Sequence, residues 1–233
     1  MIVVGLLIAV YLRKKTAEYG RYANPAGFGC TAQFAWFIQE LPAFIIPFIY
    51  VWFSTSRCGA FLTVLFLTNY FERVFIYPFN IRSKTRAPFH VVLTAFFFCT
   101  FNGWLQAHWN TYYTTCNVFS IIFLPLGSAI FAYGYYMNRR SDRILLQLRP
   151  PGEESGYKIP ETFLFEYISC PNYLGEIIQW IGYAIAARSL PAFAFLVFTI
   201  CNLAPRARSH HAWYREKFRE YPRQRTALIP FVW

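Results

Sequence analysis

Two groups of polar residues recur at helical spacing in the C-terminal part of the chain. The first group falls at i, i+4, i+7 and i+11 within an apolar segment and consists of Asn172, Glu176, Gln179 and Tyr183. The second group, mostly basic, begins directly after Pro205 at similar spacing and consists of Arg206, His210, Tyr214 and Lys217. Each group places its side chains along one face of a helix, and such a face does not point at lipid. We therefore predict that the two stripes line a polar cavity inside a membrane bundle.

Ionisable residues within apolar segments are further candidates for chemistry, and they are Glu40, Glu72, Arg73 and Glu176. Each such residue costs about 2.5–3.5 kcal/mol at the centre of a membrane, so its presence suggests a function. Glu40 follows Gln39 and precedes Pro42, whose missing backbone donor can bend the helix and open space beside the carboxyl group. Burial would favour the neutral, proton-donating form of Glu40.

A phenol and a cation lie on one face of the next apolar segment, because Tyr70, Arg73 and Tyr77 fall at i, i+3 and i+7. One interpretation is that Glu40 and this face act on a substrate. The other is a structural ion pair between a glutamate and an arginine, with the tyrosines at the membrane interface. Spacing alone leaves both interpretations open.

A basic segment separates the apolar runs that end near residue 137 and begin near residue 172. It contains Asn138–Arg143 (N-R-R-S-D-R), Arg149 and Tyr157–Pro160. Arginine and lysine side chains in such a loop could bind phosphates, and Asp142 could bind ribose hydroxyls. An ordinary basic cytoplasmic loop is the alternative interpretation.

The cysteines and histidines do not have the spacing of a metal site. The six cysteines include no C-x-x-C pair, and the adjacent His210 and His211 point in different directions on a helix, so we expect no metal. Cys58 and Cys116 fall near loops on one side of the membrane, so a disulfide between them is conceivable, although unpaired membrane cysteines are commoner. The glycine-rich dinucleotide fingerprint is also missing, so a nucleotide would have to bind by other means.

The elements that must position these residues are membrane helices. Of the 233 residues, 56% are hydrophobic and 14% charged, a balance that a soluble domain of this length could not cover with polar surface. The net charge of +11 does not indicate nucleic-acid binding, because the basic residues lie in short loops between apolar runs.

Seven apolar runs predict an all-α, polytopic bundle of seven transmembrane helices: 1–12, 32–53, 59–79, 89–109, 117–137, 172–190 and 191–204. The last two runs are separated only by Ser189–Pro191, which predicts a tight helical hairpin or broken helices. With the N-terminus outside, all of the 22 lysines and arginines except Arg57, Arg73 and Arg188 fall on the inner side. This asymmetry predicts a cytoplasmic C-terminus.

Several short motifs resemble those of the steroid 5α-reductases, including the plant brassinosteroid-pathway members. In the last ninety residues the motifs are Ser141–Arg143, Gly156–Pro160, Leu164–Tyr167, Asn172–Glu176, Trp180–Ala184, Pro205–Arg208, His210–His211 and Ala227–Phe231. The N-terminal half is similar at fewer positions, in the same order: Gln39–Glu40, Tyr70–Phe71, Arg73, Tyr77 and Asn102–Gln106. Departures are Leu146, where mammalian members tend to have an arginine, and the variable segment 80–88, which holds the candidate phosphate ligands Arg82 and Arg86.

The resemblance implies a seven-span enzyme that reduces the C4–C5 double bond of a 3-oxo-Δ4-steroid with NADPH. It implies a cofactor-binding set of Asn138, Asp142, Arg149, Tyr157, Asn172, Glu176, Arg206, His210 and Tyr214. By the same resemblance Glu40 and Tyr70 contact the steroid 3-ketone as the catalytic pair, and Gln39 and Arg73 complete the substrate-binding set. We expect one membrane domain, 1–233, in which 1–110 mainly faces the substrate and 117–233 mainly binds NADPH.

This chemistry agrees with the residues themselves. Hydride addition at C5 places negative charge on the 3-oxygen as an enolate, and Tyr70 and protonated Glu40 can donate hydrogen bonds to it. We expect a steroid and membrane lipid as partners, with no nucleic acid and no obligate protein partner. The expected location is the endoplasmic reticulum membrane in a eukaryote or the inner membrane in a bacterium.

Three other classes share features of this pattern. Membrane enoyl-thioester and other sterol double-bond reductases would keep the NADPH stripe but need a different acid near the substrate. Isoprenylcysteine or phospholipid methyltransferases are also membrane bundles, with S-adenosylmethionine as cofactor. A transporter or receptor would leave the two polar stripes without a shared purpose.

Overall fold

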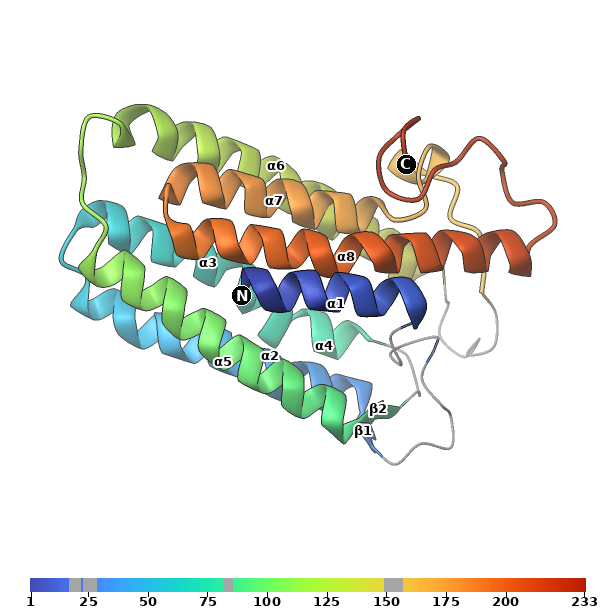
Figure 1. Ribbon diagram of the computed structural model, residues 1–233, viewed down its shortest axis with the longest axis horizontal. Coiled ribbons are helices and arrows are strands. Elements are labelled where there is room, and N and C mark those ends of the chain that lie inside the picture. The colour runs from blue at the N-terminus through green and yellow to red at the C-terminus, as the bar shows by residue number, and fades with distance from the viewer. Residues whose placement is uncertain (17–21, 23–28, 82–85, 149–156) are drawn as a thin grey trace. The chain divides into compact units, whose positions relative to one another are not determined.

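The computed structural model describes residues 1–16, 22, 29–81, 86–148 and 157–233 (Figure 1). The described residues are predominantly helical, which confirms the all-α part of the predicted fold class. Seven long helices follow the seven apolar runs: α1 (Ile2–Lys14), α2 (Ala32–Tyr50), α3 (Arg57–Phe75), α5 (Phe89–Tyr112), α6 (Ser120–Gln147), α7 (Pro171–Ala187) and α8 (Leu190–Lys217). Shorter elements are α4 (Tyr77–Asn80) and the 3₁₀ helices Val51–Phe53 and Phe163–Glu166.

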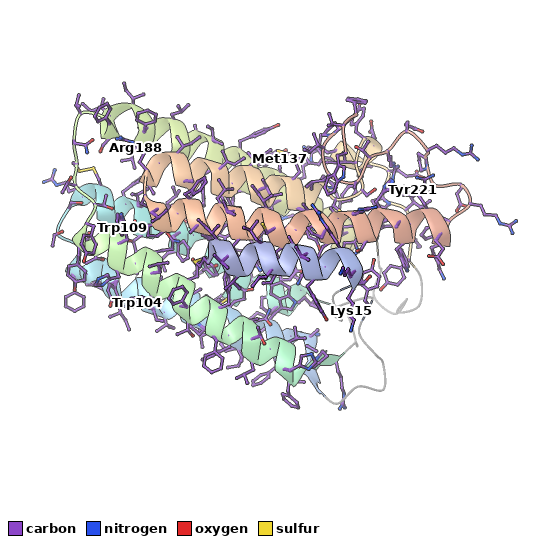
Figure 2. All side chains as sticks on the ribbon, viewed as in Figure 1. Lys15, Trp104, Trp109, Met137, Arg188 and Tyr221 are labelled. Atoms are coloured by element: carbon purple, nitrogen blue, oxygen red, sulfur yellow. A yellow bond between two sulfur atoms is a disulfide. The ribbon has the colours of Figure 1, made fainter. Side chains whose placement is uncertain are left out.

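Within the described part of the chain, four helical segments are long and apolar enough to cross a membrane: Ala32–Phe53, Arg57–Asn80, Ser120–Gln147 and Leu190–Lys217. Many of their exposed side chains are large and apolar, such as Phe48 on α2 and Ile121 on α6. Aromatic rings cluster toward the end of α5, where Trp104 and Trp109 project from the helix (Figure 2). Exposed apolar faces and aromatic clusters of this kind are typical of membrane proteins.

The chain divides into two compact units. The first, here called the α6–α8 unit, consists of Met1–Ala17, Ala129–Gly182 and Ala194–Trp233. The second, here called the α2–α5 unit, consists of Glu18–Ser128 and Tyr183–Phe193. The predicted cofactor ligands that the structure describes fall in the first unit, and the predicted substrate contacts fall in the second.

Close helix packing builds the α2–α5 unit. The Thr31 side chain caps α2 by accepting a hydrogen bond from the Phe34 N–H, and α2 continues through Pro42 and Pro47. Gly103 on α5 lies so near α2 that a Cβ there would come within 2.9 Å of the Ala43 Cα. Small residues at this contact let the two backbones approach, as in other membrane bundles.

A disulfide joins Cys58, in the first turn of α3, to Cys116 after α5. The sequence left this pairing open, with unpaired cysteines as the commoner case, and the structure shows that the disulfide forms. Hydrogen bonds bring the two loops together, since the Thr55 hydroxyl donates to the Thr111 carbonyl at 2.6 Å and the Ser56 hydroxyl donates to the Thr114 carbonyl. Because these partners lie far apart in sequence, spacing could not reveal the pairing.

A short antiparallel ribbon is the one feature of the described chain that the all-helical prediction lacks. Strands β1 (Gly29–Thr31) and β2 (Arg86–Pro88) pair with Gly29 opposite Pro88 and Thr31 opposite Arg86. A Cβ at Gly29 would meet the Ala87 carbonyl at 2.2 Å, so glycine is needed there. Strands of three residues are too short to give an alternating pattern.

Helices α6, α7, α8 and α1 lie side by side in the α6–α8 unit (Figure 1). At the α6–α7 contact, a Cβ on Gly134 would lie 2.2 Å from the Gln179 backbone nitrogen, and one on Gly175 would lie 2.5 Å from the Asn138 backbone nitrogen. Trp180 packs edge-on against Phe195 between α7 and α8, with ring centroids 4.5 Å apart. Helix α7 ends at Ala187 and α8 begins at Leu190, which confirms the predicted hairpin. Arg188, in the short connection between α7 and α8, has a positive backbone φ of 48°.

Helices α6 and α8 continue well beyond the apolar runs that predicted them. Asn138–Arg143, predicted as loop, belongs to α6, which continues to Gln147. The segment contains no proline or glycine, and Arg139 and Asp142 lie at i, i+3, so nothing local ends the helix after the apolar run. Similarly, α8 passes through Pro205 and ends at Lys217, beyond the predicted apolar run.

The residues after α8 fold back on the start of α7. Thr226 bridges Ile168 in parallel, the Ser169 N–H donates to the Thr226 carbonyl at 2.9 Å, and the Cys170 N–H donates to the Ala227 carbonyl at 3.2 Å. Ala227 and Leu228 join a buried apolar cluster with Cys170, Ile177 and Ala207. The C-terminal segment is therefore an integral part of the α6–α8 unit.

Candidate active site

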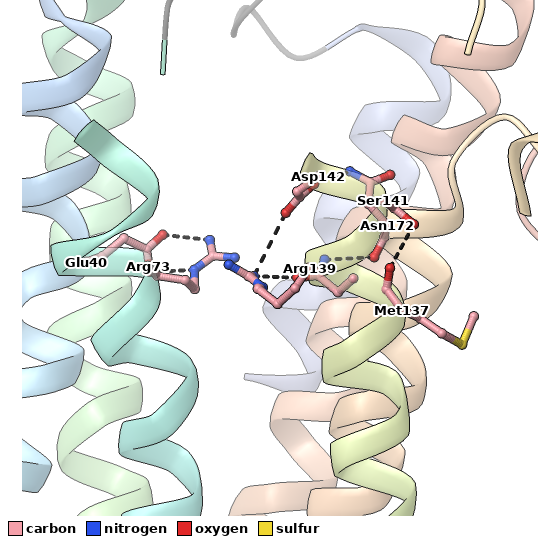
Figure 3. Close-up of polar contacts among 8 residues, drawn as sticks. Glu40, Arg73, Met137, Arg139, Ser141, Asp142 and Asn172 are labelled. Carbon is pink, nitrogen blue, oxygen red and sulfur yellow. Dashed lines mark hydrogen bonds and ion pairs between the residues drawn. The ribbon is translucent and has the colours of Figure 1, made fainter. Parts of the chain in front are cut away.

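Glu40 and Arg73 form an ion pair between α2 and α3 (Figure 3). Arg73 Nη2 donates to Glu40 Oε1 at 2.8 Å, and Arg73 Nε donates to Glu40 Oε2 at 3.2 Å. Glu40 is only 5% exposed, so a carboxylate there needs such a partner. Of the two interpretations that the sequence leaves open, the structure shows the ion pair, and it does not test catalysis by Glu40.

Aromatic and thiol groups surround this pair. The Arg73 guanidinium lies 5.0 Å from the centre of the Trp36 ring, and Trp36 in turn packs edge-on against Tyr77 at 5.1 Å. The buried Cys99 on α5 directs its Sγ toward Glu40 Oε2 at 3.8 Å. Residues of α2, α3 and α5 thus converge on one buried carboxylate.

Tyr70 lies on α3 one turn before Arg73, which places the two side chains on the same side of the helix. It is 3% exposed, and its ring packs at 4.6 Å on that of Phe66. Gln39 is also buried, next to Glu40 in sequence. Of the four predicted substrate residues, Gln39, Glu40 and Tyr70 are therefore buried and Arg73 is partly buried.

A bonded network in the α6–α8 unit unites three predicted cofactor residues (Figure 3). Asn138 Nδ2 donates to the Asn172 carbonyl at 2.9 Å, and Asn172 Nδ2 donates to Asp142 Oδ1 at 3.1 Å. Arg139, which the sequence analysis did not single out, is 7% exposed and donates to Asn138 Oδ1 while its Nη2 lies 3.9 Å from Asp142 Oδ2. Close contact at Gly175 permits this network, because it brings the two helix backbones together.

The polar stripe on α7 faces the protein interior, as predicted. Gln179 and Tyr183 are completely buried, and Asn172 and Glu176 are half-buried. In the α2–α5 unit the Tyr183 hydroxyl accepts a hydrogen bond from Asn110 Nδ2 at 2.9 Å. The stripe is thus shielded from lipid along its length.

The stripe on α8 is buried only in part. Arg206 and His210 are half-buried and Tyr214 is 3% exposed, whereas Lys217 is exposed. The hydrogen bond recorded between α7 and His210 comes from Tyr173, whose hydroxyl lies 3.1 Å from His210 Nε2. Tyr173 lies about 100° around the helix from Asn172, so this contact is made beside the α7 stripe rather than by it.

Arg206 carries a buried nitrogen that lacks a hydrogen-bond partner. Its Nε is shielded from solvent, and no acceptor among the described residues reaches it. An unpaired buried guanidinium nitrogen is costly, which indicates an acceptor supplied by a bound molecule. Phosphate or carboxylate oxygens are the natural partners of such a group.

The remaining predicted cofactor residues have separate surroundings. The Tyr157 ring packs edge-on against Trp213 at 4.8 Å, and Trp213 packs on its neighbour Tyr214 at 5.2 Å. Arg149 and the candidate phosphate ligand Arg82 lie outside the described residues, and Arg86 is exposed on β2. Among the described residues, no three His, Cys, Asp or Glu side chains gather as metal ligands do.

A second buried network, absent from the sequence analysis, centres on Ser169. Its Oγ lies 2.6 Å from His211 Nδ1 and 2.7 Å from the Tyr221 hydroxyl. Burial raises the pKa of Tyr221, and the hydrogen bond with Ser169 opposes that shift. The three residues show no common periodicity, although Ser169 precedes a resembling motif and His211 belongs to one.

Comparison with known proteins indicates a family for the whole chain. A family described as 3-oxo-5-alpha-steroid 4-dehydrogenase matches residues 85–233. The chain is 40% identical to 3-oxo-5-alpha-steroid 4-dehydrogenase 1 of Bos taurus over 246 residues, which cover 98% of this chain and 93% of that protein. It is 42% identical to 3-oxo-5-alpha-steroid 4-dehydrogenase 2 of Homo sapiens over 241 residues, an alignment that covers 100% of this chain and 93% of that protein. It is 43% identical to 3-oxo-5-alpha-steroid 4-dehydrogenase 2 of Sus scrofa over 236 residues, an alignment that covers 97% of this chain and 91% of that protein.

Proposed function

Because the chain belongs to the 3-oxo-5-alpha-steroid 4-dehydrogenase family, we propose that it reduces the C4–C5 double bond of a 3-oxo-Δ4-steroid with NADPH. It is an oxidoreductase that acts on a CH–CH group, as its relatives are. Within the structure, the observation that carries the proposal is the bonded network of Asn138, Asp142 and Asn172. It joins Asp142 and Asn172, which come from two separate family motifs, to Asn138 of the predicted cofactor set.

The residues of the α6–α8 unit fit a nicotinamide dinucleotide. The Asp142 carboxylate and the Asn138 and Asn172 amides supply acceptors and donors suited to ribose hydroxyls and a carboxamide. The Arg206 Nε, buried without a partner, suits a phosphate oxygen. Glu176, His210, Tyr214, Tyr157 and Arg149 complete the proposed set.

Bound NADPH would supply the hydride that adds to C5 of the steroid. As C5 accepts it, the 3-oxygen becomes an enolate, and a proton then adds to C4, so the double bond is reduced by two electrons and two hydrogens. The buried Tyr70 hydroxyl is the proposed donor to the developing enolate oxygen. A neutral phenol can donate without any change of protonation.

In this proposal Arg73 acts through its ion pair with Glu40. In the structure Glu40 accepts two hydrogen bonds from Arg73, so donation from Glu40 to the ketone requires that the carboxylate first bind a proton. Arg73 fixes the position of the carboxyl group, and the Trp36 ring fixes the guanidinium. Tyr70 and protonated Glu40 together would polarise the 3-ketone, and Gln39 would line the same region.

We place the chain in the membrane with seven spans, the N-terminus outside and the C-terminus in the cytoplasm. Besides the four long apolar segments, α5 has 24 residues and α7 has 17, which correspond to about 36 Å and 26 Å of helix. The disulfide between Cys58 and Cys116 supports this orientation, because it puts the loops before α3 and after α5 in an oxidising compartment. In a eukaryote that arrangement suits the endoplasmic reticulum.

Product identification tests the proposed reaction. Purified protein is incubated with NADPH and, separately, testosterone, progesterone and a plant-type 3-oxo-Δ4-sterol, and the products are analysed by mass spectrometry and NMR. We expect the 5α-reduced 3-ketone from at least one steroid. If no steroid is reduced but an enoyl thioester is, the proposal fails in favour of an enoyl-thioester reductase. Thermal stabilisation by S-adenosylmethionine and not by NADPH would instead indicate a methyltransferase.

A further inference from the structure

The Ser169 hydroxyl joins three separate segments of the α6–α8 unit. Ser169 lies just before α7, His211 lies in the C-terminal half of α8, and Tyr221 and Thr226 lie in the segment after α8. Ser169 Oγ is 2.6 Å from His211 Nδ1, 2.7 Å from the Tyr221 hydroxyl and 3.2 Å from the Thr226 carbonyl oxygen. Ser169 and Tyr221 are 4% and 5% exposed, so water cannot easily replace these contacts.

The number of hydrogens fixes the direction of each bond. A serine hydroxyl has one hydrogen and two lone pairs, and a carbonyl oxygen can only accept. For all three contacts to be hydrogen bonds, Ser169 must donate to the Thr226 carbonyl and accept from both His211 Nδ1 and the Tyr221 hydroxyl. The one hydrogen and both lone pairs of the Ser169 hydroxyl are then engaged in hydrogen bonds. None of the other residues in the network can make these bonds in place of Ser169.

This network leads directly to residues of the proposed cofactor set. Tyr221 stacks on Tyr214, with ring centroids 5.3 Å apart and planes inclined by 13°. On the other side, Ser169 lies three residues before Asn172, and its backbone N–H is bonded to Thr226. The two adjacent histidines also face different partners, since His210 contacts Tyr173 and His211 contacts Ser169.

We infer that Ser169, His211 and Tyr221 are positioning residues for NADPH binding, which they support by fixing the Tyr214 ring and the first turn of α7 without touching the cofactor. The inference rests on the proposed function, in which Tyr214 and Asn172 bind NADPH. It also explains why the C-terminal segment folds back on α7: the segment holds residues of a site formed by α6, α7 and α8 in position.

Four variants of the full-length protein in detergent test the inference. Ser169→Ala removes the shared hydroxyl, whereas Ser169→Thr keeps one. Tyr221→Phe keeps the ring that stacks on Tyr214 but loses the hydrogen bond. Ser209→Ala is the matched control, because it also removes a serine hydroxyl from this region, one that only donates to the Pro205 carbonyl of its own helix.

Ser169→Ala should raise the Kd and the KM for NADPH about tenfold, the effect of losing about 1.4 kcal/mol of hydrogen-bond energy. The KM for the steroid should stay at its wild-type value. Ser169→Thr should recover most of the NADPH affinity, Tyr221→Phe should lie between Ser169→Ala and wild type, and Ser209→Ala should match wild type. Amide hydrogen exchange at Thr226 and Ala227 should accelerate in Ser169→Ala without any nucleotide present.

The outcomes separate the inference from the proposed function. If wild-type protein does not bind NADPH, the proposed function fails, and the inference fails with it. If wild-type protein binds NADPH and both Ser169→Ala and Tyr221→Phe bind it equally well, only the inference is overturned, even where exchange of the C-terminal segment has accelerated. If Ser169→Ala does not fold, the NADPH affinity of Tyr221→Phe relative to Ser209→Ala decides.

Discussion

At the scale of single residues, the α2–α5 unit pairs the buried Glu40 carboxyl group with the partly buried Arg73 guanidinium. Glu40 and Arg73 satisfy each other through two hydrogen bonds, and Tyr70 lies one turn away on α3. A pair of this kind keeps a carboxyl group at a fixed place in an apolar region, where an unpaired charge would be costly. The arrangement leaves the Tyr70 phenol as the hydrogen-bond donor that needs no proton from elsewhere.

Replacing Tyr70 by Phe and Glu40 by Gln should separate chemistry from cofactor binding. Both substitutions keep much of the side-chain shape, so NADPH should still bind, while the rate of steroid reduction should fall about 10²–10³-fold in Tyr70→Phe, as for loss of one donor to an oxyanion. If the two donors act as one unit, the double variant should be little slower than the slower single variant. Single-turnover rates with saturating NADPH measure this. Near-normal turnover in both single variants would point to Arg73 or Tyr77.

The hydrogen bond between Asn172 and Asp142 gives a second test at this scale. Asn172→Ala should weaken NADPH binding by removing an amide that donates to Asp142 at 3.1 Å. Asn172→Asp should weaken it more, since two carboxylates would then face each other at hydrogen-bond distance. Isothermal titration with NADPH measures the difference, and Arg206→Ala and His210→Ala should also bind more weakly. Unchanged affinity in all of these variants would refute the proposed cofactor set.

The sequence anticipates part of this detail. Periodicity and cost of burial identify Glu40, Arg73, Asn172 and Gln179 as interior residues, because a polar side chain inside an apolar helix must face the protein. The Ser169 network could not be predicted in the same way. Its members come from a bend, a helix and an irregular segment, and such a contact depends on how the chain folds back rather than on any local pattern.

At the scale of elements, hydropathy predicts the helices but not where each one ends. Apolar runs locate all seven long helices, whereas α6 and α8 continue beyond their runs into polar sequence. The continuation matters for the proposed cofactor site, because it places Asn138 and Asp142 on one helix instead of in a loop. A site on a helix holds its side chains more closely than a site on a loop does.

The α6–α7 contact depends on two glycines, which provides a prediction for this scale. Gly134→Ala should lower the Tm in detergent, because its Cβ would lie 2.2 Å from the Gln179 backbone nitrogen and the helices would have to separate. Overpacking of this kind costs about 1–3 kcal/mol. Gly175→Ala should in addition weaken NADPH binding, since its Cβ would displace Asn138. Ala132→Leu, on the exposed side of α6, is the control and should leave the Tm unchanged.

At the scale of the whole molecule, charge and sulfur chemistry give two separate indications of orientation. Except for Arg57, Arg73 and Arg188, the lysines and arginines fall on one side of the seven predicted spans. The disulfide between Cys58 and Cys116 lies in the loops that the same topology puts on the other side. Charge distribution could be read from the sequence, whereas the disulfide needed the fold, because helices α3 and α5 bring its two cysteines together.

Reporter tags can test this orientation in intact membrane vesicles. Tags at the C-terminus and within 148–162, the part of the predicted 139–162 loop that follows α6, should be accessible from the cytoplasmic side. A tag at the N-terminus should be accessible only from the opposite side. A maleimide that cannot cross the membrane should label Cys58 and Cys116 only after reduction, and only from the side opposite to the C-terminus. The single variants Cys58→Ser and Cys116→Ser, each of which frees one thiol, should become labelled from that side without reduction. Finding both termini on one side would contradict an odd number of spans, and labelling of the freed thiol from the cytoplasmic side would contradict the proposed orientation.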